Sequence, residues 1–295
     1  MATNNQNLSV RSYQPQFREL LQAVFASRAY FRDFFGGGIE ALDGVQHNET
    51  AFYVKTSDIP VVVGSAYNKG ENVGFGTGTG KTTRFGNRTE IIYTDTPVPY
   101  TWEWVFHEGI DRHTVNQDFQ VAVADRLDLQ AQAKVAKFNA QHSAFISSVA
   151  GKTEQIADYS EQSVLLLFNA LSAYFTNIEA VGTKVAKVKP ELYNAIVDHP
   201  AATTAKHSSA NVDTNTILMF KGFIIEELPE TMFQSGEVCY AYITGVGKAF
   251  TGINTARTIE SEDFDGVALQ GAGKAGEFIL VDNKKAVAKV TKTDG

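Results

Sequence analysis

Hydrophobic and polar positions follow two different periods along this chain of 295 residues. Between residues 15 and 31 apolar residues recur every three or four positions, which predicts a helix with one apolar face. Pro15 suits the first turn of that helix, and Gly36-Gly37-Gly38 ends the pattern. The polar residues 1–14 show no periodicity and predict a flexible arm. The positions of this helical pattern are Phe17, Leu20, Leu21, Val24, Phe25, Arg28 and Phe31.

From about residue 51 to residue 107 the period becomes two, which predicts β-strands. An ascending strand is predicted around 52–63, interrupted at Pro60, and a returning strand at 100–107. The segment between them, 65–88, is rich in Gly, Asn, Thr and Lys. A lone hairpin is marginal in water, so we expect its aromatic face to pack on something outside the hairpin, within or between subunits. That loop packing face consists of Tyr100, Trp102, Trp104 and Phe106.

A single long helix is predicted from Asp111 to Val149, because no Pro or Gly interrupts this stretch. At 1.5 Å per residue it would be on the order of 55 Å long. Apolar and small residues recur along this helix at alternating spacings of three and four, and this seam could indicate a coiled coil. Alanine dominates the seam and Arg126 interrupts it, so we favour packing of the helix on a sheet. The seam residues are Val115, Phe119, Ala122, Leu129, Ala133, Ala136 and Ala140.

Helices and strands alternate in the remaining chain. Residues 158–175 predict a helix with a capping box at Asp158 and Glu161, and 190–197 predict a shorter helix that ends at His199-Pro200. Strands are predicted at 217–220, 222–226, 238–244, 278–281 and 286–290, with a turn at Asp282-Asn283.

Composition excludes several classes of protein. A net charge of −7 and a pI near 5.4 argue against a dedicated nucleic-acid binder. Cys239 is the single cysteine, so no intrachain disulfide is possible and a reducing compartment fits. No apolar run is long enough to span a bilayer, and the first residues do not have the pattern of a secretion signal.

The stretch Gly74 to Thr83, GFGTGTGKTT, imitates a phosphate-binding loop. A P-loop needs its first glycine five residues before the second, and that position holds Phe75. Neither a strand before the loop nor a helix after it is indicated. We therefore interpret the stretch as a glycine-rich loop tip, and a nucleotide-binding enzyme is kept as a distant alternative.

Other candidate chemistry is equally weak. His107 and His113 lie six residues apart, a spacing that does not place both rings on one helix face for zinc. Cys239 lies in an apolar strand without neighbouring cations, which favours an inert core thiol over a nucleophile. The aromatic strand has no cationic groove beside it for stacking nucleic-acid bases. We predict no catalytic, metal or cofactor-binding residue.

Two stretches of the sequence carry a family resemblance most clearly, and a third adds to it. TDTPVPYTWEWVFHEGIDRHTVNQDF, followed by ADRLDLQAQAKVAKFNAQHSAFISS, looks like the returning arm of an extended loop that leads into a spine helix. GVGKAFTGINTARTIESEDFDGVALQGAGKAGEFIL is similar to strands that return to a peripheral domain, and KVKPELYNAIVDHP looks like an axial-domain helix. In this order the chain resembles the major capsid protein of tailed double-stranded DNA phages, with the Hong Kong 97 type fold.

The resemblance implies an α+β fold with five parts. These are an N-terminal arm and helix (1–49), an extended β-hairpin loop (50–110), the spine helix of a peripheral domain (111–150), an α/β axial domain (151–249), and the return to the peripheral domain with C-terminal strands (250–295).

The implied function is assembly. Copies would form hexamers and pentamers that close into an icosahedral shell, the capsid of a virion, around DNA that is not bound sequence-specifically. Scaffolding and portal proteins would be separate partners, and neither a cofactor nor a membrane is implied. No motif marks a covalent cross-link, and none is predicted. The shell of a bacterial nanocompartment, which has the same fold, is the alternative. The extended loop would cross a neighbouring subunit through Tyr67, Lys69, Phe75, Lys81, Arg84 and Phe85.

Overall fold

The chain forms two compact units in a computed structural model, His47–Pro99 and the combination of Met1–Gln46 with Tyr100–Gly295. Residues 15–27 of the helix predicted at 15–31 lie outside the described residues, as does the glycine-rich stretch 74–83. Residues 28–31 are described and form no helix, so the predicted end of that helix is wrong. The structure describes residues 28–37, 39–41, 50–57, 59, 61, 63–64, 67, 69, 84–85, 90–115, 118–203 and 209–293.

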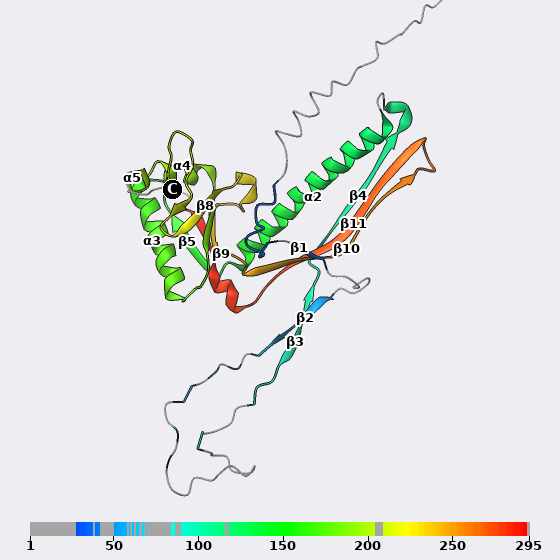
Figure 1. The fold of residues 1–295 in the computed structure, drawn as a ribbon. Helices are drawn as coiled ribbons and strands as arrows, with labels where there is room; N and C mark the ends of the chain where they lie inside the picture. Colours follow the sequence, from blue (N-terminus) through cyan, green and yellow to red (C-terminus); the bar gives the residue numbers. More distant parts are fainter. Residues whose placement is uncertain are drawn as a thin grey trace, which may run out of the picture. The chain divides into compact units, whose positions relative to one another are not determined.

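The smaller unit contains a two-stranded antiparallel ladder of β2 (Thr50–Thr56) and β3 (Thr94–Pro99) (Figure 1). Phe52 pairs with Val98 in this ladder. The prediction that residues 100–107 return beside the ascending strand is wrong. The true partner strand, β3, contains two prolines, which made it look unlike a strand in the sequence. Proline is tolerated in an edge strand, because the backbone positions on its outer side do not need to donate a hydrogen bond to another strand.

The larger unit contains a four-stranded sheet in the order β1-β10-β11-β4. Strands β10 and β11 form a long antiparallel hairpin, β4 adds to β11, and β1 pairs parallel to β10. The sequence pattern indicated little of this sheet, because β10 and β11 are rich in Gly, Ala and Thr. The strands are β1 (Ile39–Ala41), β4 (Trp102–Asp111), β10 (Gly247–Glu260) and β11 (Gly266–Ile279).

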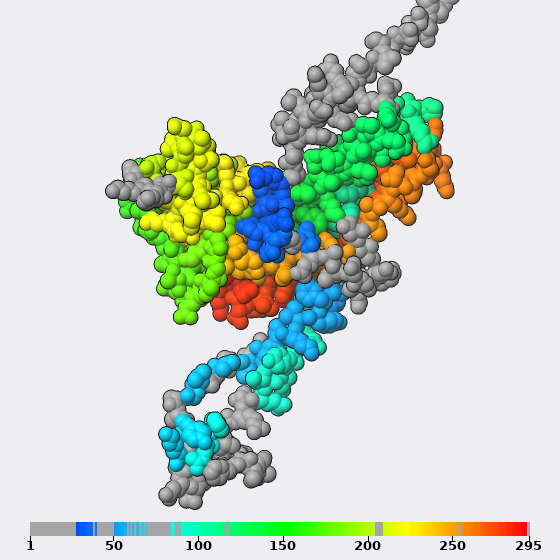
Figure 2. All heavy atoms as spheres, viewed as in Figure 1, coloured from blue at the N-terminus to red at the C-terminus, as the bar shows by residue number. Residues whose placement is uncertain are grey.

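Helix α2 (Phe119–Val149) lies along one face of this sheet, green beside orange in Figures 1 and 2. It begins eight residues later than predicted, because β4 extends to Asp111 and a 3₁₀ turn, η1 (Arg112–Thr114), follows. Asp118 caps the helix by accepting a hydrogen bond from Gln120 N.

The prediction of which α2 face meets the sheet is also wrong. Leu129 of the predicted seam is 47% exposed, and the seam alanines Ala133, Ala136 and Ala140 are exposed. Val123 and Phe138 pack on the sheet instead. Because alanines occupy several faces of this helix, spacing alone could not identify the packed one.

A six-stranded sheet follows, in the order β5-β12-β9-β6-β8-β7. Helices α3 (Glu161–Asn177), α4 (Pro190–Val197) and α5 (Pro200–Thr203) accompany it, with short 3₁₀ turns η2 (Glu230–Met232) and η3 (Asp282–Ala286). The strands are β5 (Lys152–Ile156), β6 (Lys184–Val188), β7 (Met219–Phe220), β8 (Phe223–Glu227), β9 (Glu237–Ile243) and β12 (Val287–Lys292).

Apolar burial holds these helices on the sheet. The predicted stripe of α3 is confirmed, since Val164, Phe168 and Leu171 are fully buried. Its predicted capping box is wrong: Ser160 caps the helix through Ser163 N, while Asp158 accepts from Ser160 N. The predicted bounds of α4 are confirmed.

Cys239 is confirmed as a core residue. It lies in β9, where every residue is buried, and its side chain is 0% exposed. Burial raises the pKa of its thiol well above the usual value. The thiol is therefore protonated at neutral pH and unreactive.

Candidate assembly surfaces

The aromatic strand β4 packs inside its own subunit. Trp102 meets the ring of Phe138 edge-on at 4.6 Å between centroids, and Lys134 Nζ lies 4.0 Å from the centroid of Trp104. Trp104 is only 5% exposed. Gly273 on the paired strand provides the space, because a Cβ there would lie 2.6 Å from the Trp104 ring.

The other two predicted residues of the packing face also find partners within the larger unit. The Tyr100 ring lies 5.7 Å from that of Phe250, and Phe106 lies 5.6 Å from Trp104. All four side chains thus belong to the larger unit and not to the two-stranded hairpin. Assigning them to a loop packing face was wrong, because alternation along a strand identifies a buried face without identifying which strand pairs with it.

A buried polar group completes this helix–sheet interface. Glu277 on β11 accepts hydrogen bonds from Trp102 Nε1 at 3.0 Å and from Thr101 Oγ1 at 3.2 Å. Burial raises the pKa of Glu277, and these hydrogen bonds oppose the rise. His142 Nε2 on α2 lies 4.0 Å from this carboxylate, and burial lowers the pKa of His142 to about 4. The imidazole is therefore neutral at pH 7.

The segment 30–37 connects the two sheets of the larger unit. Phe34 is fully buried and meets Tyr242 edge-on at 4.9 Å. Asp33 accepts a hydrogen bond from Tyr242 OH at 3.0 Å and lies 3.2 Å from Lys187 Nζ. Lys187 is 1% exposed and also bonds Glu226, so a buried ammonium is compensated by two carboxylates.

A second buried charge network lies beside α2. Glu237 accepts hydrogen bonds from Ser147, Tyr240 and Lys289 at 2.5, 2.6 and 2.9 Å. Burial raises the pKa of Glu237, but the three hydrogen bonds outweigh this effect and lower it overall. The carboxylate therefore remains charged at neutral pH and fixes α2 to β9 and β12.

Apolar side chains of the smaller unit are left in solvent. Val61 and Val63 are each 88% exposed, which is unusual for aliphatic residues. A contiguous exposed apolar patch typically marks an interaction surface, and the exposed apolar residues of this unit lie in two short stretches of the chain, 53–67 and 85–93. We call this set the hairpin apolar surface: Tyr53, Ile59, Val61, Val63, Tyr67, Phe85, Ile91, Ile92 and Tyr93.

The structure brings together part of the predicted inter-subunit loop. The rings of Tyr67 and Phe85 meet edge-on at 5.1 Å, although Phe85 is 87% exposed. Lys69 is exposed and Arg84 is half-buried. Phe75 and Lys81 lie outside the described residues.

Sequence reasoning missed the glycines of β11 and the buried residues Glu277 and Asn139. One signal was present: Gly271 and Gly273 are two residues apart, as are Trp104 and Phe106 on the paired strand. No group of three or more metal-binding side chains occurs among the described residues. In that same part of the chain, no helix has both the length and the apolar character needed to cross a membrane.

Comparison with known proteins places the fold. No family model and no curated protein sequence matches the chain. Solved structures do match: the mature capsid of bacteriophage PhiM1 has a TM-score of 0.67 at 10% identity, covering 92% of this chain and 89% of that one. The capsid of cyanophage P-SCSP1u has a TM-score of 0.65 at 9% identity, covering 92% and 90%.

A particle from a cellular organism is also similar. The virus-like particle from Pyrococcus furiosus has a TM-score of 0.54 at 13% identity, covering 92% of this chain and 95% of that one. The chain therefore has the Hong Kong 97 type α+β fold, and this fold extends over nearly its whole length.

Proposed function

We propose that this chain is a major capsid protein, which assembles as hexamers and pentamers into an icosahedral shell around the double-stranded DNA of a tailed phage. The observation that carries the proposal is the match over 92% of the chain to two phage capsid structures. Such coverage includes both sheets and α2, so the likeness is not limited to one common motif.

The hairpin apolar surface supports assembly. Burying an exposed aliphatic or aromatic side chain contributes roughly 1.5–3 kcal/mol, and β2–β3 is a two-stranded ladder that is marginal by itself. A neighbouring copy that covered this surface would supply both the burial and the ordering. The predicted loop residues Tyr67, Lys69, Arg84 and Phe85 would contact that copy.

The net charge of the chain supports a function in which the protein encloses DNA. The formal charge of −7 disfavours tight binding of a polyanion to the subunit, so DNA would be enclosed and not gripped. Separate scaffolding and portal proteins would assist assembly. The chain would have no enzymatic role and would be located in the virion.

Negative-stain imaging and sedimentation of the purified protein test the proposal. The expected result is a uniform population of closed shells with a fast sedimentation boundary. Monomers or small oligomers across salt and crowding conditions, with or without a co-expressed scaffold, would contradict it. Shells that hold a protein cargo and no DNA in the native host would indicate the nanocompartment instead.

A further inference from the structure

Lys187 places a primary amine in the interior of the larger unit. It belongs to β6, and its side chain is only 2% exposed. Replacing a buried ion pair by apolar residues of similar size is often neutral or stabilising. Stability alone therefore does not explain a lysine at this position, and the groups around its amine indicate what else it can do.

Two carboxylates from distant parts of the chain meet this amine. Lys187 Nζ lies 3.2 Å from Asp33 Oδ1, and it also contacts Glu226 Oε2 on the adjacent strand β8. The side chain of Asp33 is 25% exposed and that of Glu226 is 49% exposed. The amine is thus shielded from water, whereas both carboxylates keep contact with solvent.

A buried hydroxyl completes the group. Tyr242 OH on β9 donates a hydrogen bond to Asp33 Oδ2 at 3.0 Å, the carboxylate oxygen opposite the one that meets Lys187. Tyr242 is fully buried. Burial, followed by the charge of Asp33, raises the pKa of Tyr242 well above its usual value. The hydroxyl therefore stays protonated at neutral pH and polarises the carboxyl group of Asp33.

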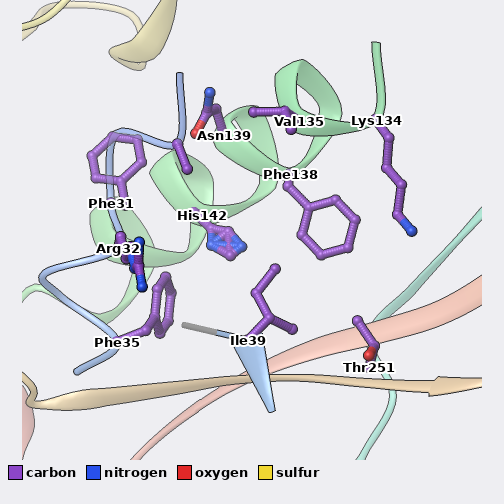
Figure 3. Close-up of a pocket in the computed structure, with 11 residues that line it drawn as sticks. Phe31, Arg32, Phe35, Ile39, Lys134, Val135, Phe138, Asn139, His142 and Thr251 are labelled. Atoms are coloured by element: carbon purple, nitrogen blue, oxygen red, sulfur yellow. The ribbon is translucent and has the colours of Figure 1, made fainter. Parts of the chain in front are cut away.

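The backbone around Asp33 is held in a fixed position. Asp33 O accepts a hydrogen bond from Gly245 N at 2.9 Å, and the carbonyl of the following residue accepts from Gly247 N at 3.1 Å. On either side of Asp33 in the chain, Phe31 and Phe35 are buried beside α2 (Figure 3). The carboxyl group is therefore held against the amine, and such positioning favours a reaction between the two.

We propose that Lys187 and Asp33 condense to an amide, which is an isopeptide bond within one chain. Glu226 accepts a proton from the ammonium group, and the freed lone pair on Lys187 Nζ attacks Asp33 Cγ. Tyr242 stabilises the negative charge that develops on Asp33 Oδ2. The inference concerns a single chain and does not depend on shell formation.

The reaction needs no other reactant. An ammonium and a carboxylate together contain one water more than the amide and have no net charge, so nothing is oxidised or reduced. The bond between Lys187 Nζ and Asp33 Cγ forms, and the bond between Cγ and Oδ1 breaks. One ammonium proton stays on the amide nitrogen. The other two, one of them by way of Glu226, leave with Oδ1 as water, and the partial exposure of Asp33 gives this water an exit.

A second lysine–carboxylate contact in the same unit offers a comparison. Lys289 Nζ lies 2.9 Å from Glu237 Oε1, and its other polar contact among the described residues is the hydroxyl of Ser147. The Lys289 side chain is also 25% exposed. In the described part of the chain no second carboxylate is placed to take a proton from this amine, so we expect no bond between Lys289 and Glu237.

Mass spectrometry of the full chain tests the inference. The purified parent, denatured before measurement, should be lighter than its sequence mass by one water. After digestion with trypsin, a branched peptide should join Asp33 to Lys187, whereas Lys289 should be unlinked. A succinimide at an Asp-Gly step such as Asp265-Gly266 would remove the same mass, so the branched peptide decides.

This measurement uses the parent and does not depend on whether a variant folds. If Asp33 and Lys187 occur only in unlinked peptides after prolonged incubation of the folded protein, the inference is overturned. A branched peptide that contains Lys289 in place of Lys187 would overturn it as well, because the base would then be unnecessary.

Three variants separate the bond from the ion pair. Lys187→Arg keeps the positive charge but has no nucleophilic amine, so it should have the unmodified mass, whereas Lys289→Arg is the matched control and should keep the branched peptide. Glu226→Gln keeps the side-chain shape and removes the base, so it should slow bond formation by a factor of about 10²–10⁴ in samples taken at intervals after synthesis. Equal rates in this variant and the parent would contradict the proposed mechanism.

Discussion

The imidazole of His142 lies between two aromatic rings, 4.4 Å from Phe35 and 5.7 Å from Phe138. Its depressed pKa means that the folded state binds fewer protons than the unfolded state as the pH falls. The stabilisation is complete above pH 6.5 and is lost between pH 6.5 and about 4, by about 3 kcal/mol in total. Glu277 acts in the opposite direction, because its raised pKa favours proton uptake by the folded state.

We therefore predict that His142→Phe weakens the loss of stability between pH 6.5 and 4. The phenyl ring keeps the aromatic contacts and cannot titrate. His113→Phe is the control, since the His113 side chain is 80% exposed. Urea unfolding at a series of pH values measures the effect. If both variants keep the parent's pH dependence, the His142 assignment fails.

Gly273 allows a second prediction at this scale. A Cβ at Gly273 would lie 2.6 Å from the Trp104 ring, whereas one at Gly271 would lie 3.3 Å from its nearest neighbour. Overpacking of a core costs about 1–3 kcal/mol, so Gly273→Ala should lower the free energy of unfolding by that amount. Gly271→Ala should cost less. Thermal unfolding of the two variants measures which one loses more stability, and a larger loss of stability for Gly271→Ala would contradict the prediction.

At the scale of elements, helix α2 stabilises the larger unit by packing on its four-stranded sheet. The helix is 31 residues long and packs on the sheet through Phe138 and Val123. Ala133 lies in its interior on the exposed side. Ala133→Pro should destabilise by about 3 kcal/mol or more, because it removes a helical hydrogen bond and adds a ring clash.

Ala133→Gly is the matched control for this helix prediction. It should cost only about 1 kcal/mol, since it changes propensity without breaking the helix. Circular dichroism and thermal unfolding measure both variants. Proline and glycine variants of equal stability would show that α2 is not continuous through residue 133.

The elements also show which features the sequence could predict. Helix α4 was predicted with correct bounds because Pro190 and Pro200 mark both ends. The facing side of α2 could not be predicted, because small residues lie all around the helix. Strand β3 was missed because Pro97 and Pro99 argue against a strand. Periodicity did not mark strands β10 and β11, because their glycines and alanines hide the alternation of apolar and polar residues; only the family resemblance of residues 245–280 indicated strands there.

The candidate surfaces were predicted unevenly for a related reason. Composition identified residues 65–88 as a segment with few apolar contacts of its own. The aromatic residues of β4 were predicted to pack within or between subunits, and Trp104 is buried within the larger unit. The packing partners of this strand, Phe138 and Glu277, lie 34 or more residues away from Trp104 in the chain. Which residues pack against this strand depends on tertiary contacts, and these cannot be predicted from the periodicity of the sequence.

At the scale of the whole molecule, the hairpin should matter for assembly and not for subunit stability. Replacing Asn68–Gly86 by an Asn-Gly turn removes the predicted contact residues Lys69, Phe75, Lys81, Arg84 and Phe85. Because the replaced residues belong to the smaller unit and the two large sheets belong to the other one, thermal unfolding of the subunit should stay close to the parent's. If the parent forms shells as proposed, sedimentation of this variant should show subunits or small oligomers instead.

A matched variant separates shortening from loss of apolar contact. Val61→Ser with Val63→Ser keeps the full length of the hairpin and removes two side chains that are each 88% exposed. We expect slower or incomplete shell formation with unchanged subunit unfolding. Normal shells from both variants would show that the hairpin apolar surface is not an assembly contact.

The position of β12 has a consequence for the order in which the subunit is made. Strand β12 is the last described strand in the chain, yet it lies between β5 and β9 and alone joins β5 to the six-stranded sheet. The ribosome synthesises β5, β6, β8 and β9 before β12. The position between β5 and β9 therefore stays without a strand until residues 287–292 have been synthesised. Chains that stop early keep two unpaired strand edges, which are exposed to proteases and to wrong pairing. Only a chain translated through residue 292 can close this sheet, so a chain that stops before β12 lacks the strand that joins β5 to β9.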